Sequence, residues 1–388
     1  MIRMIRELPW NYKCDFKKFL LSLVLAWSSF SCSSIVSNDD ASNTQKDFPT
    51  VNLYIDDENY ASLLQQKLLN YYVPAIIEYY GAYRSGIIRP YGSGSRYYPA
   101  WSYHILIKEK APVGSFVLSS QVNDKTMLRS ILMVTLCNKV GVRTPDVELV
   151  TVTINGEYQH LYLKTDRIDE YYFSNHGESL VELIKAGSSS VFLLNDPRFT
   201  LFSFEKQYPD DDNLSAFVEF LDMLSKVSKD SSVWKEFETS YLDVPSYLTF
   251  HALMVITNNR DGLTNNFLLY RLQARSPYEI ITHDFDSAFD VDGDIELTGG
   301  NEIIKALSQN EEWKKQYYLI MKEIAEKYFT EELLFPIIDA NAPKILQASK
   351  TASYFNENLY SYEVDALKNF ITRRRALVLS KCNADLAR

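Results

Sequence analysis

The spacing of hydrophobic residues changes along this chain, from the two-residue period of strands to the longer period of helices. Residues 50–55 (TVNLYI) favour a strand, and residues 147–165 predict a hairpin that turns at Asn155-Gly156. One helix is predicted in this half, over residues 126–140, before Gly141 ends it. Because one element cannot satisfy both periods, the change favours separate β-rich and helical parts.

The second half of the chain is predicted to be mainly helical. Hydrophobic stripes at helical spacing occur in residues 214–224, 313–328 and 364–379. Residues 266–286 (NFLLYRLQARSPYEIITHDFD) lie among them and predict two strands joined by a turn. We therefore predict an α+β, bilobal fold. Its β-rich N-terminal lobe spans residues 48–195, and its mainly helical C-terminal lobe spans residues 196–388.

The charge and the cysteines of the chain narrow the classes of function. The formal net charge of -10 disfavours broad binding to nucleic acid, although a local basic pocket for a nucleotide is compatible with it. Arg373, Arg374 and Arg375 occur inside a predicted helix, where we expect a solvated or lobe-bridging face. The four cysteines form no CxxC pair and no zinc spacing, which argues against a disulfide framework.

The N-terminus has the pattern of an export signal. Basic residues, including Lys17 and Lys18, precede a short apolar run over residues 19–27, and small residues then lead to Cys32. This pattern predicts a signal peptide over residues 1–31, with Cys32 as the lipidated first residue of a surface or periplasmic lipoprotein. An ordinary cleaved signal with an incidental cysteine is the alternative. Residues 32–47 are polar and predict a flexible tether.

One loop has the spacing of a phosphoryl-transfer site. Arg260-Asp261 is followed by Asn266, which matches the R-D-x-x-x-x-N pattern of a kinase catalytic loop. In such a loop the Asp accepts the proton of the attacking hydroxyl, and the Asn ligates a metal that bridges the phosphates. Alone, this short spacing is also found in ordinary loops, because Asn and Asp are common turn residues.

A second acidic motif follows the predicted strands. Asp284 and Asp286 stand where a kinase places its metal-holding Asp, and carboxylates are ligands that Mg²⁺ or Mn²⁺ prefers. A solvated acidic turn is one alternative. A calcium-binding EF-hand loop that starts at Asp290 is another, but Ile295 replaces its required Gly and Asn301 replaces its bidentate Glu. The nearness of the two motifs in sequence therefore favours a phosphoryl-transfer site.

Several segments, in order, resemble the CotH kinase-like family of secretory protein kinases. The run NNRDGLTNNFLLYR followed by YEIITHDFDSAFD resembles the family's two acidic motifs. Upstream, IIRPYGSGSRYYPAWSYHILI resembles its R-G-x-x-S segment with a following lysine pair. The block from LRSILMVTLCNKVG to YLKTDRID resembles its long central region. Together these segments cover most of the chain that follows the predicted tether.

The resemblance implies an atypical protein-kinase-like fold and a serine/threonine kinase that uses ATP with Mg²⁺ or Mn²⁺ on exported proteins. By position, Asp261 would be the catalytic base, and Asn266, Asp284 and Asp286 would hold metal. Residues implied to contact the nucleotide are Arg89, Lys108, Asp166 and Lys185.

Three departures from the family pattern concern the nucleotide. Ala100 and Trp101 stand at the family's lysine pair, Asp166 replaces a Glu, and Asp290 replaces a Gly. Lys108 or Lys185 could supply the missing charge. Two functions therefore follow: an active kinase with a nucleotide and a protein substrate, or a degenerate surface lipoprotein that acts as a binding or structural module. In both, the membrane is contacted only through the N-terminal lipid.

Overall fold

A computed structural model describes residues 47–92, 95–107, 114–187, 203–227, 229–290, 296–297, 299, 302–350, 352 and 355–387. The predicted signal peptide, the lipidation site Cys32 and the candidate nucleotide contact Lys108 lie outside these residues. None of the helices in the described part of the chain is both long and apolar enough to cross a membrane.

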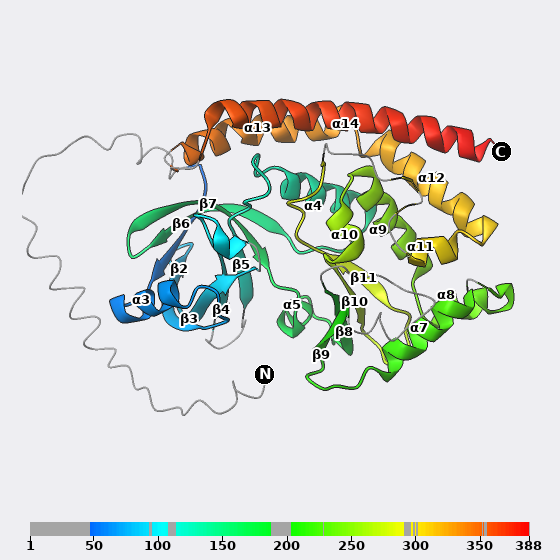
Figure 1. The fold of residues 1–388 in the computed structure, drawn as a ribbon, viewed down its shortest axis with the longest axis horizontal. Helices are drawn as coiled ribbons and strands as arrows, with labels where there is room; N and C mark the ends of the chain where they lie inside the picture. Colours follow the sequence, from blue (N-terminus) through cyan, green and yellow to red (C-terminus); the bar gives the residue numbers. More distant parts are fainter. Residues whose placement is uncertain are drawn as a thin grey trace, which may run out of the picture. The chain divides into compact units, whose positions relative to one another are not determined.

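The N-terminal lobe is a closed barrel with strand order β1-β2-β3-β4-β5-β7-β6 (Figure 1). All neighbours are antiparallel except β1 and β6, whose parallel pairing closes the barrel. Alternate residues fill it, including Val51, Leu53 and Val152. The elements of this lobe are β1 (Thr50–Tyr54), α3 (Asp57–Gln65), β2 (Val73–Tyr79), β3 (Ala82–Tyr91), the 3₁₀ turn η3 (Ser95–Tyr97), β4 (Ser102–Ile107), β5 (Ser115–Ser119), α4 (Arg129–Val140), β6 (Val147–Ile154), β7 (Glu157–Asp166) and α5 (Glu170–Asn175).

Two local predictions in this lobe are confirmed. The β6–β7 hairpin turns at Asn155 and Gly156, whose φ angles of 52° and 86° are those of a type I′ turn. Helix α4 ends at Gly141, which has a left-handed φ of 77°.

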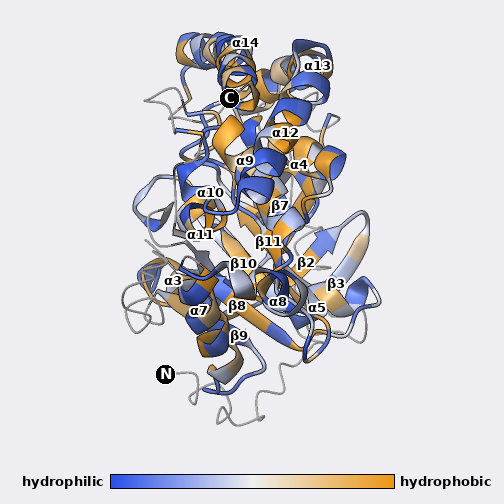
Figure 2. Cartoon of the chain, turned by 90° about the vertical axis from the view of Figure 1, so that its right-hand side faces the viewer, coloured by the Kyte–Doolittle hydropathy of each residue, from blue (hydrophilic) through white to orange (hydrophobic). Residues whose placement is uncertain are grey.

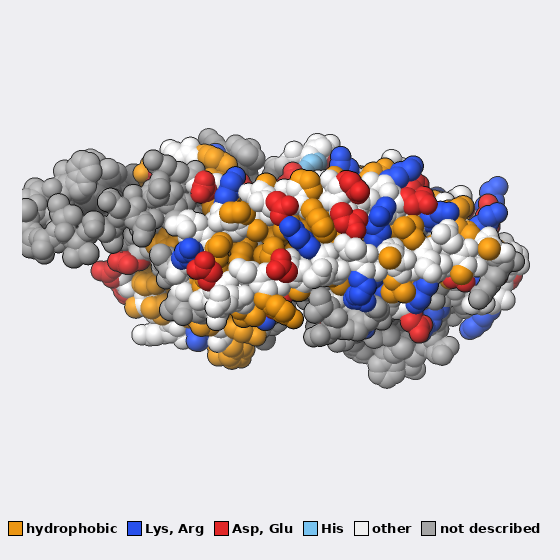
Figure 3. Space-filling model, turned by 90° about the horizontal axis from the view of Figure 1, so that it is seen from above, with side chains coloured by type: hydrophobic (Ala, Val, Ile, Leu, Met, Phe, Trp, Pro, Cys, Tyr) orange, Lys and Arg blue, Asp and Glu red, His pale blue; other side chains and the backbone are white. Residues whose placement is uncertain are grey.

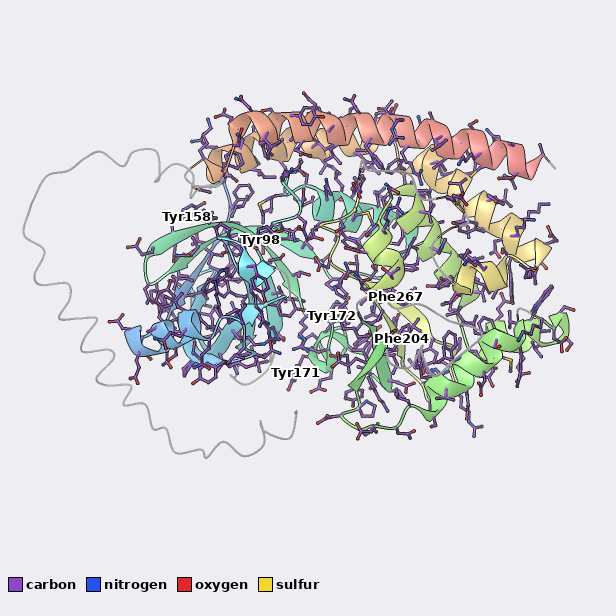
Figure 4. The ribbon with its side chains drawn as sticks, viewed as in Figure 1. Tyr98, Tyr158, Tyr171, Tyr172, Phe204 and Phe267 are labelled. Carbon is purple, nitrogen blue, oxygen red and sulfur yellow. The ribbon has the colours of Figure 1, made fainter. Side chains whose placement is uncertain are left out.

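A second sheet follows, with strand order β11-β10-β8-β9. Phe204 and Phe267 pack together on it, with ring centroids 6.2 Å apart (Figure 4). The predicted lobe boundary at residue 195 lies outside the described residues, and β8, which precedes it, pairs with β10 rather than with the barrel. The strands are β8 (Glu182–Ala186), β9 (Phe204–Tyr208), β10 (Phe267–Arg271) and β11 (Glu279–Thr282).

Helices make up most of the rest of the C-terminal lobe. Helix α9 is buried on nearly every side because α4, α12, α14 and β11 surround it, and Figure 2 shows its hydrophobic residues. It leads directly into the RDxxxxN loop. The helices are α7 (Ser215–Val227), η4 (Ser231–Val233), α8 (Trp234–Ser240), α9 (Val244–Ile256), α10 (Arg260–Thr264), α11 (Glu302–Leu307), α12 (Glu311–Lys327), α13 (Glu331–Ser349) and α14 (Glu357–Leu386).

The last two helices lie side by side and contact both lobes (Figure 1). Tyr158 of β7 donates a hydrogen bond to the carbonyl of Ala348 at 3.0 Å. Figure 3 views the molecule from the side on which α13 and α14 lie, and it shows acidic and basic side chains interspersed there. Ion pairs such as Lys368–Asp339 agree with this. The expectation of a solvated or lobe-bridging face is wrong for Arg374, which is fully buried against α9, because the helical period turns one of three successive residues inward.

Candidate active site

The loop that carries Asp261 is held at its start, where it follows α9. Arg374 donates hydrogen bonds to the carbonyls of Val255 and Ile256, at the end of α9. The Asn259 side chain then caps α10 by accepting from Gly262 N at 2.9 Å. A side chain at Gly262 would lie 2.4 Å from the Met254 sulfur, so glycine is required for this close approach.

The same loop is tied to the segment that follows Asp286. The Asn258 amide donates to the carbonyl of Asp290 at 2.7 Å, and Phe289 N donates to the carbonyl of Thr257 at 2.6 Å. Asn258 and Phe289 both have left-handed φ angles, of 52° and 57°. These cross-links fix the two acidic motifs relative to one another.

Asn266 and Asp284 are brought together where β10 begins and β11 ends. The Asn266 amide nitrogen donates to the main-chain carbonyl of Asp284 at 2.9 Å, which leaves the amide oxygen as an acceptor. His283 N donates to the carbonyl of Asn266 at 3.1 Å. Asp284 itself has a left-handed φ of 57°, uncommon for a residue other than glycine. Such local strain is often found at functional sites.

Ser287 links the two acidic motifs through its side chain. Its hydroxyl lies 2.9 Å from Asp261 Oδ2 and 3.3 Å from Asp286 Oδ1. Asp261, Asp284 and Asp286 thus share one small region, as their spacing in the sequence predicts. Their roles in chemistry are proposed below.

Negative charge is concentrated in this region. Desolvation by the surrounding protein, together with the charges of Asp286 and Asp261, raises the pKa of Asp284, while the Lys185 ammonium opposes the shift. Because the Asp284 side chain is exposed to water, repulsion from the neighbouring carboxylates raises its pKa more than desolvation does. Burial also raises the pKa of Asp286, and a hydrogen bond from Asn123 opposes that shift.

The connection between β5 and α4 contributes residues that sequence reasoning missed. Asn123 donates to Asp286 Oδ2 at 2.9 Å, and Arg129 donates to the main-chain carbonyl of Asp286 at 3.2 Å. Asp124 is buried and holds this connection in place by accepting from the backbone nitrogens of Thr126 and Arg129. The signal in the sequence is a polar run, QVNDK, placed between an apolar strand and an apolar helix.

The candidate nucleotide contacts lie in different places. Lys185 of β8 acts electrostatically on both Asp284 and His283. Arg89 lies in the barrel between the rings of Tyr72 and Tyr91. Asp166 ends β7, with its carboxylate 3.6 Å from Lys164. Among the described residues, no hydrogen bond or ion pair joins Arg89 or Asp166 to the three acids of the site.

The donor chemistry of the site fits a hard divalent cation. Asp284, Asp286 and the Asn266 amide offer oxygen ligands, and a cation would relieve the repulsion that raises the pKa of both acids. In the part of the chain that the structure describes, no three His, Cys, Asp or Glu side chains already form a coordination shell.

A two-lobed α+β fold with a base candidate beside metal-ligand candidates defines a kinase-like protein. The family model described as CotH kinase protein matches residues 88–378, and the chain therefore belongs to this family. It is similar to the inner spore coat protein H of Bacillus subtilis (strain 168), with 25% identity over 301 residues that cover 73% of this chain and 83% of that protein. The inner spore coat protein H-like protein of the same organism is 25% identical over 261 residues, which cover 66% of this chain and 76% of that protein.

Two solved structures are also similar in part. The Helicobacter pylori proinflammatory kinase CtkA aligns with a TM-score of 0.32 and 10% identity, over 72% of this chain and 94% of that one. The HipA–HipB–operator DNA complex of Shewanella oneidensis MR-1 includes a chain that aligns with a TM-score of 0.38 and 12% identity, over 87% of this chain and 74% of that one.

Proposed function

We propose that this protein is an ATP- and metal-dependent serine/threonine kinase that acts on exported or surface proteins. The observation that carries the proposal is the Ser287 hydroxyl, which lies within hydrogen-bonding distance of both Asp261 and Asp286. A candidate base and a candidate metal ligand thus lie beside one hydroxyl, which supports a phosphoryl-transfer site. Membership of the CotH kinase family supports the same class of reaction.

Each residue of the site has a role in this proposal. Asp261 orients the acceptor hydroxyl and takes its proton, and Asn266, Asp284 and Asp286 hold Mg²⁺ or Mn²⁺. When bound, ATP would supply the phosphoryl group and the metal would neutralise its charge. Lys185 contributes a positive charge beside Asp284. Arg89, Lys108 and Asp166 are proposed to contact the nucleotide.

A degenerate binding or structural module is the second candidate. It is favoured by Ala100 and Trp101, which replace the lysine pair implied by the family resemblance. Ala100 is buried, and Lys67 lies over the Trp101 ring at 5.2 Å, so neither side chain at these two positions offers a charge to a phosphate group. Such a module would have the same fold and surface location but would not transfer phosphate.

Replacing Asp261 by Asn distinguishes the two functions. With labelled ATP, Mn²⁺ and a serine-rich exported protein, transfer should fall by roughly two to four orders of magnitude, the usual worth of a positioned acid–base group. Titration calorimetry should show ATP binding nearly unchanged. Asp212→Asn, at an exposed position outside the site, is the matched control and should transfer phosphate like the wild type. If the wild type neither transfers phosphate nor binds ATP with Mn²⁺, the degenerate module is the correct function.

The location of the protein is part of the proposal. The similarity to spore coat proteins supports an exported or surface protein, and a coat or surface protein is the proposed substrate. We further propose that Cys32 is lipidated. Acyl labelling of expressing cells should mark the protein, Cys32→Ser should abolish the label, and Cys14→Ser should retain it. A mature N-terminus several residues away from Cys32 would exclude the lipid anchor.

A further inference from the structure

Two arginines in the barrel lobe converge on one neutral side chain. Arg89 NH1 lies 3.1 Å from Asn70 Oδ1, and Arg96 NH2 lies 2.7 Å from the same oxygen. In the described residues, neither guanidinium has a carboxylate within 4.0 Å. An amide oxygen accepts hydrogen bonds but carries no negative charge, so these two cations meet without a carboxylate partner among the described residues.

Arg96 is the less compensated of the two. It is 8% exposed, and its buried Nε has no hydrogen-bond partner in the part of the chain that the structure describes. Burial and the charge of Arg89 lower its pKa, which shows that the protein around it disfavours the positive charge. Arg89 differs, because its guanidinium lies 5.3 Å from the Tyr72 ring centroid and 5.4 Å from that of Tyr91, where cation–π attraction offsets part of the cost.

The neighbouring side chain of His104 adds no negative charge. His104 pairs with Arg89 across β3 and β4, and burial together with the charges of Arg167 and Arg89 lowers its pKa to about 3, so it is neutral. Its ring nitrogens are taken up by the Tyr72 hydroxyl at 2.7 Å and the Ser115 hydroxyl at 2.6 Å. A buried cation without a carboxylate partner lowers the stability of the fold. The chain has 50 acidic residues, yet no described one pairs with Arg96.

We propose that Arg89 and Arg96 form a binding site for a phosphoryl oxyanion. Two guanidinium groups offer several parallel donors, which matches the geometry of phosphate better than that of a monatomic anion. The oxyanion can come from the phosphate chain of a nucleotide or from free inorganic phosphate. The nucleotide source rests on the proposed kinase function, in which Arg89 contacts the nucleotide, whereas binding of the oxyanion itself does not.

Metal-free binding measurements test the site without relying on transfer. Inorganic phosphate, tripolyphosphate and ATP are each titrated in EDTA at matched ionic strength, with wild type, Arg96→Met and Arg84→Met. Arg84 lies on the same strand β3, so its replacement is the control for loss of one positive charge. We expect Arg96→Met to weaken binding about tenfold or more, since a charge-assisted hydrogen bond is usually worth that factor, and Arg84→Met to bind like wild type.

A second measurement separates a binding site from a structural arginine. Without anion, Arg96→Met should melt at the same or a higher temperature than wild type, because it removes a buried, unpaired charge. Added tripolyphosphate should raise the melting temperature of wild type but not of Arg96→Met. A variant that melts lower without anion and binds tripolyphosphate as wild type does would overturn the inference.

The anions themselves distinguish the two sources. Tighter binding of tripolyphosphate and ATP than of phosphate identifies the nucleotide chain as the ligand, and equal binding of all three identifies free phosphate. Asp284→Asn should retain tripolyphosphate binding in EDTA. If the oxyanion binds but no transfer activity is found, the kinase proposal fails and this site stands.

Discussion

The Ser287 hydroxyl lies 2.9 Å from Asp261 Oδ2 and 3.3 Å from Asp286 Oδ1. A hydroxyl carries one proton, so it donates to one of these carboxylates at a time. The bond to Asp261 is the shorter, and it leaves the other carboxylate oxygen available to an acceptor hydroxyl. In the proposed mechanism, Ser287 would therefore be a positioning residue that orients Asp261 and separates two like charges.

Replacing Ser287 by Ala should lower kcat about tenfold, because the Asp261 carboxylate loses the hydrogen bond that orients it. The KM for ATP should change little. Ser287→Thr keeps the hydroxyl and should restore most of the rate. A wild-type kcat in Ser287→Ala would show that the bond does not orient the base.

Asp284→Asn should change stability in a way that depends on pH. The folded-state pKa of Asp284 is raised, so this carboxyl favours folding fully only below its ordinary pKa of about 3.9, and that contribution is lost as the pH rises. At pH 8 without metal the variant should therefore be more stable than wild type, by less than about 1 kcal/mol because water reaches the side chain.

Urea unfolding at pH 8 and near pH 4 measures this difference, which should shrink at the lower pH. Added Mn²⁺ should raise the melting temperature of wild type and not that of Asp284→Asn. Equal stabilisation of both proteins by Mn²⁺ would place the metal elsewhere.

Arg374→Met should destabilise the protein by about 2–4 kcal/mol, because two buried carbonyls at the end of α9 lose their charged donor. The loss of unfolding free energy should be smaller in Arg374→Lys, which keeps the positive charge but not the planar guanidinium group. Arg373→Met, at the exposed neighbouring position, is the control and should cost less than about 0.5 kcal/mol. Equal losses in Arg373→Met and Arg374→Met, measured by urea unfolding, would contradict this role.

His251→Phe should reduce the acid sensitivity of the fold. Burial lowers the pKa of His251 to about 3, so the folded protein keeps it neutral while the unfolded chain takes up a proton below about pH 6.5. Between pH 7.5 and 5.5, wild type should therefore lose about 1.4 kcal/mol more unfolding free energy than the variant. Each protein is compared with itself at the two pH values, so the packing cost of the substitution cancels. Parallel losses would show that His251 is not the titrating group.

Much of the local structure follows from residues that are neighbours in the sequence. The hairpin at Asn155-Gly156 and the end of α4 at Gly141 depend on φ angles that these residues adopt easily, so their positions were predictable. The RDxxxxN spacing likewise predicted that Asp261 and Asn266 share one short loop, because Asn266 N reaches back to the carbonyl of Asp261.

Other features were decided only when distant segments packed together. Asn123 bonds to Asp286 across 163 residues, Arg374 bonds to Val255 across 119, and β8 joins β10 rather than the barrel. Arg89 and Arg96 meet at Asn70 because β3 and the turn after it bring them to one side chain. The sequence alone thus determined many of the elements, the pair of acidic loops and the family resemblance. Tertiary packing decided which side chains meet, because contacts between distant segments depend on the shape of the whole core and not on local spacing.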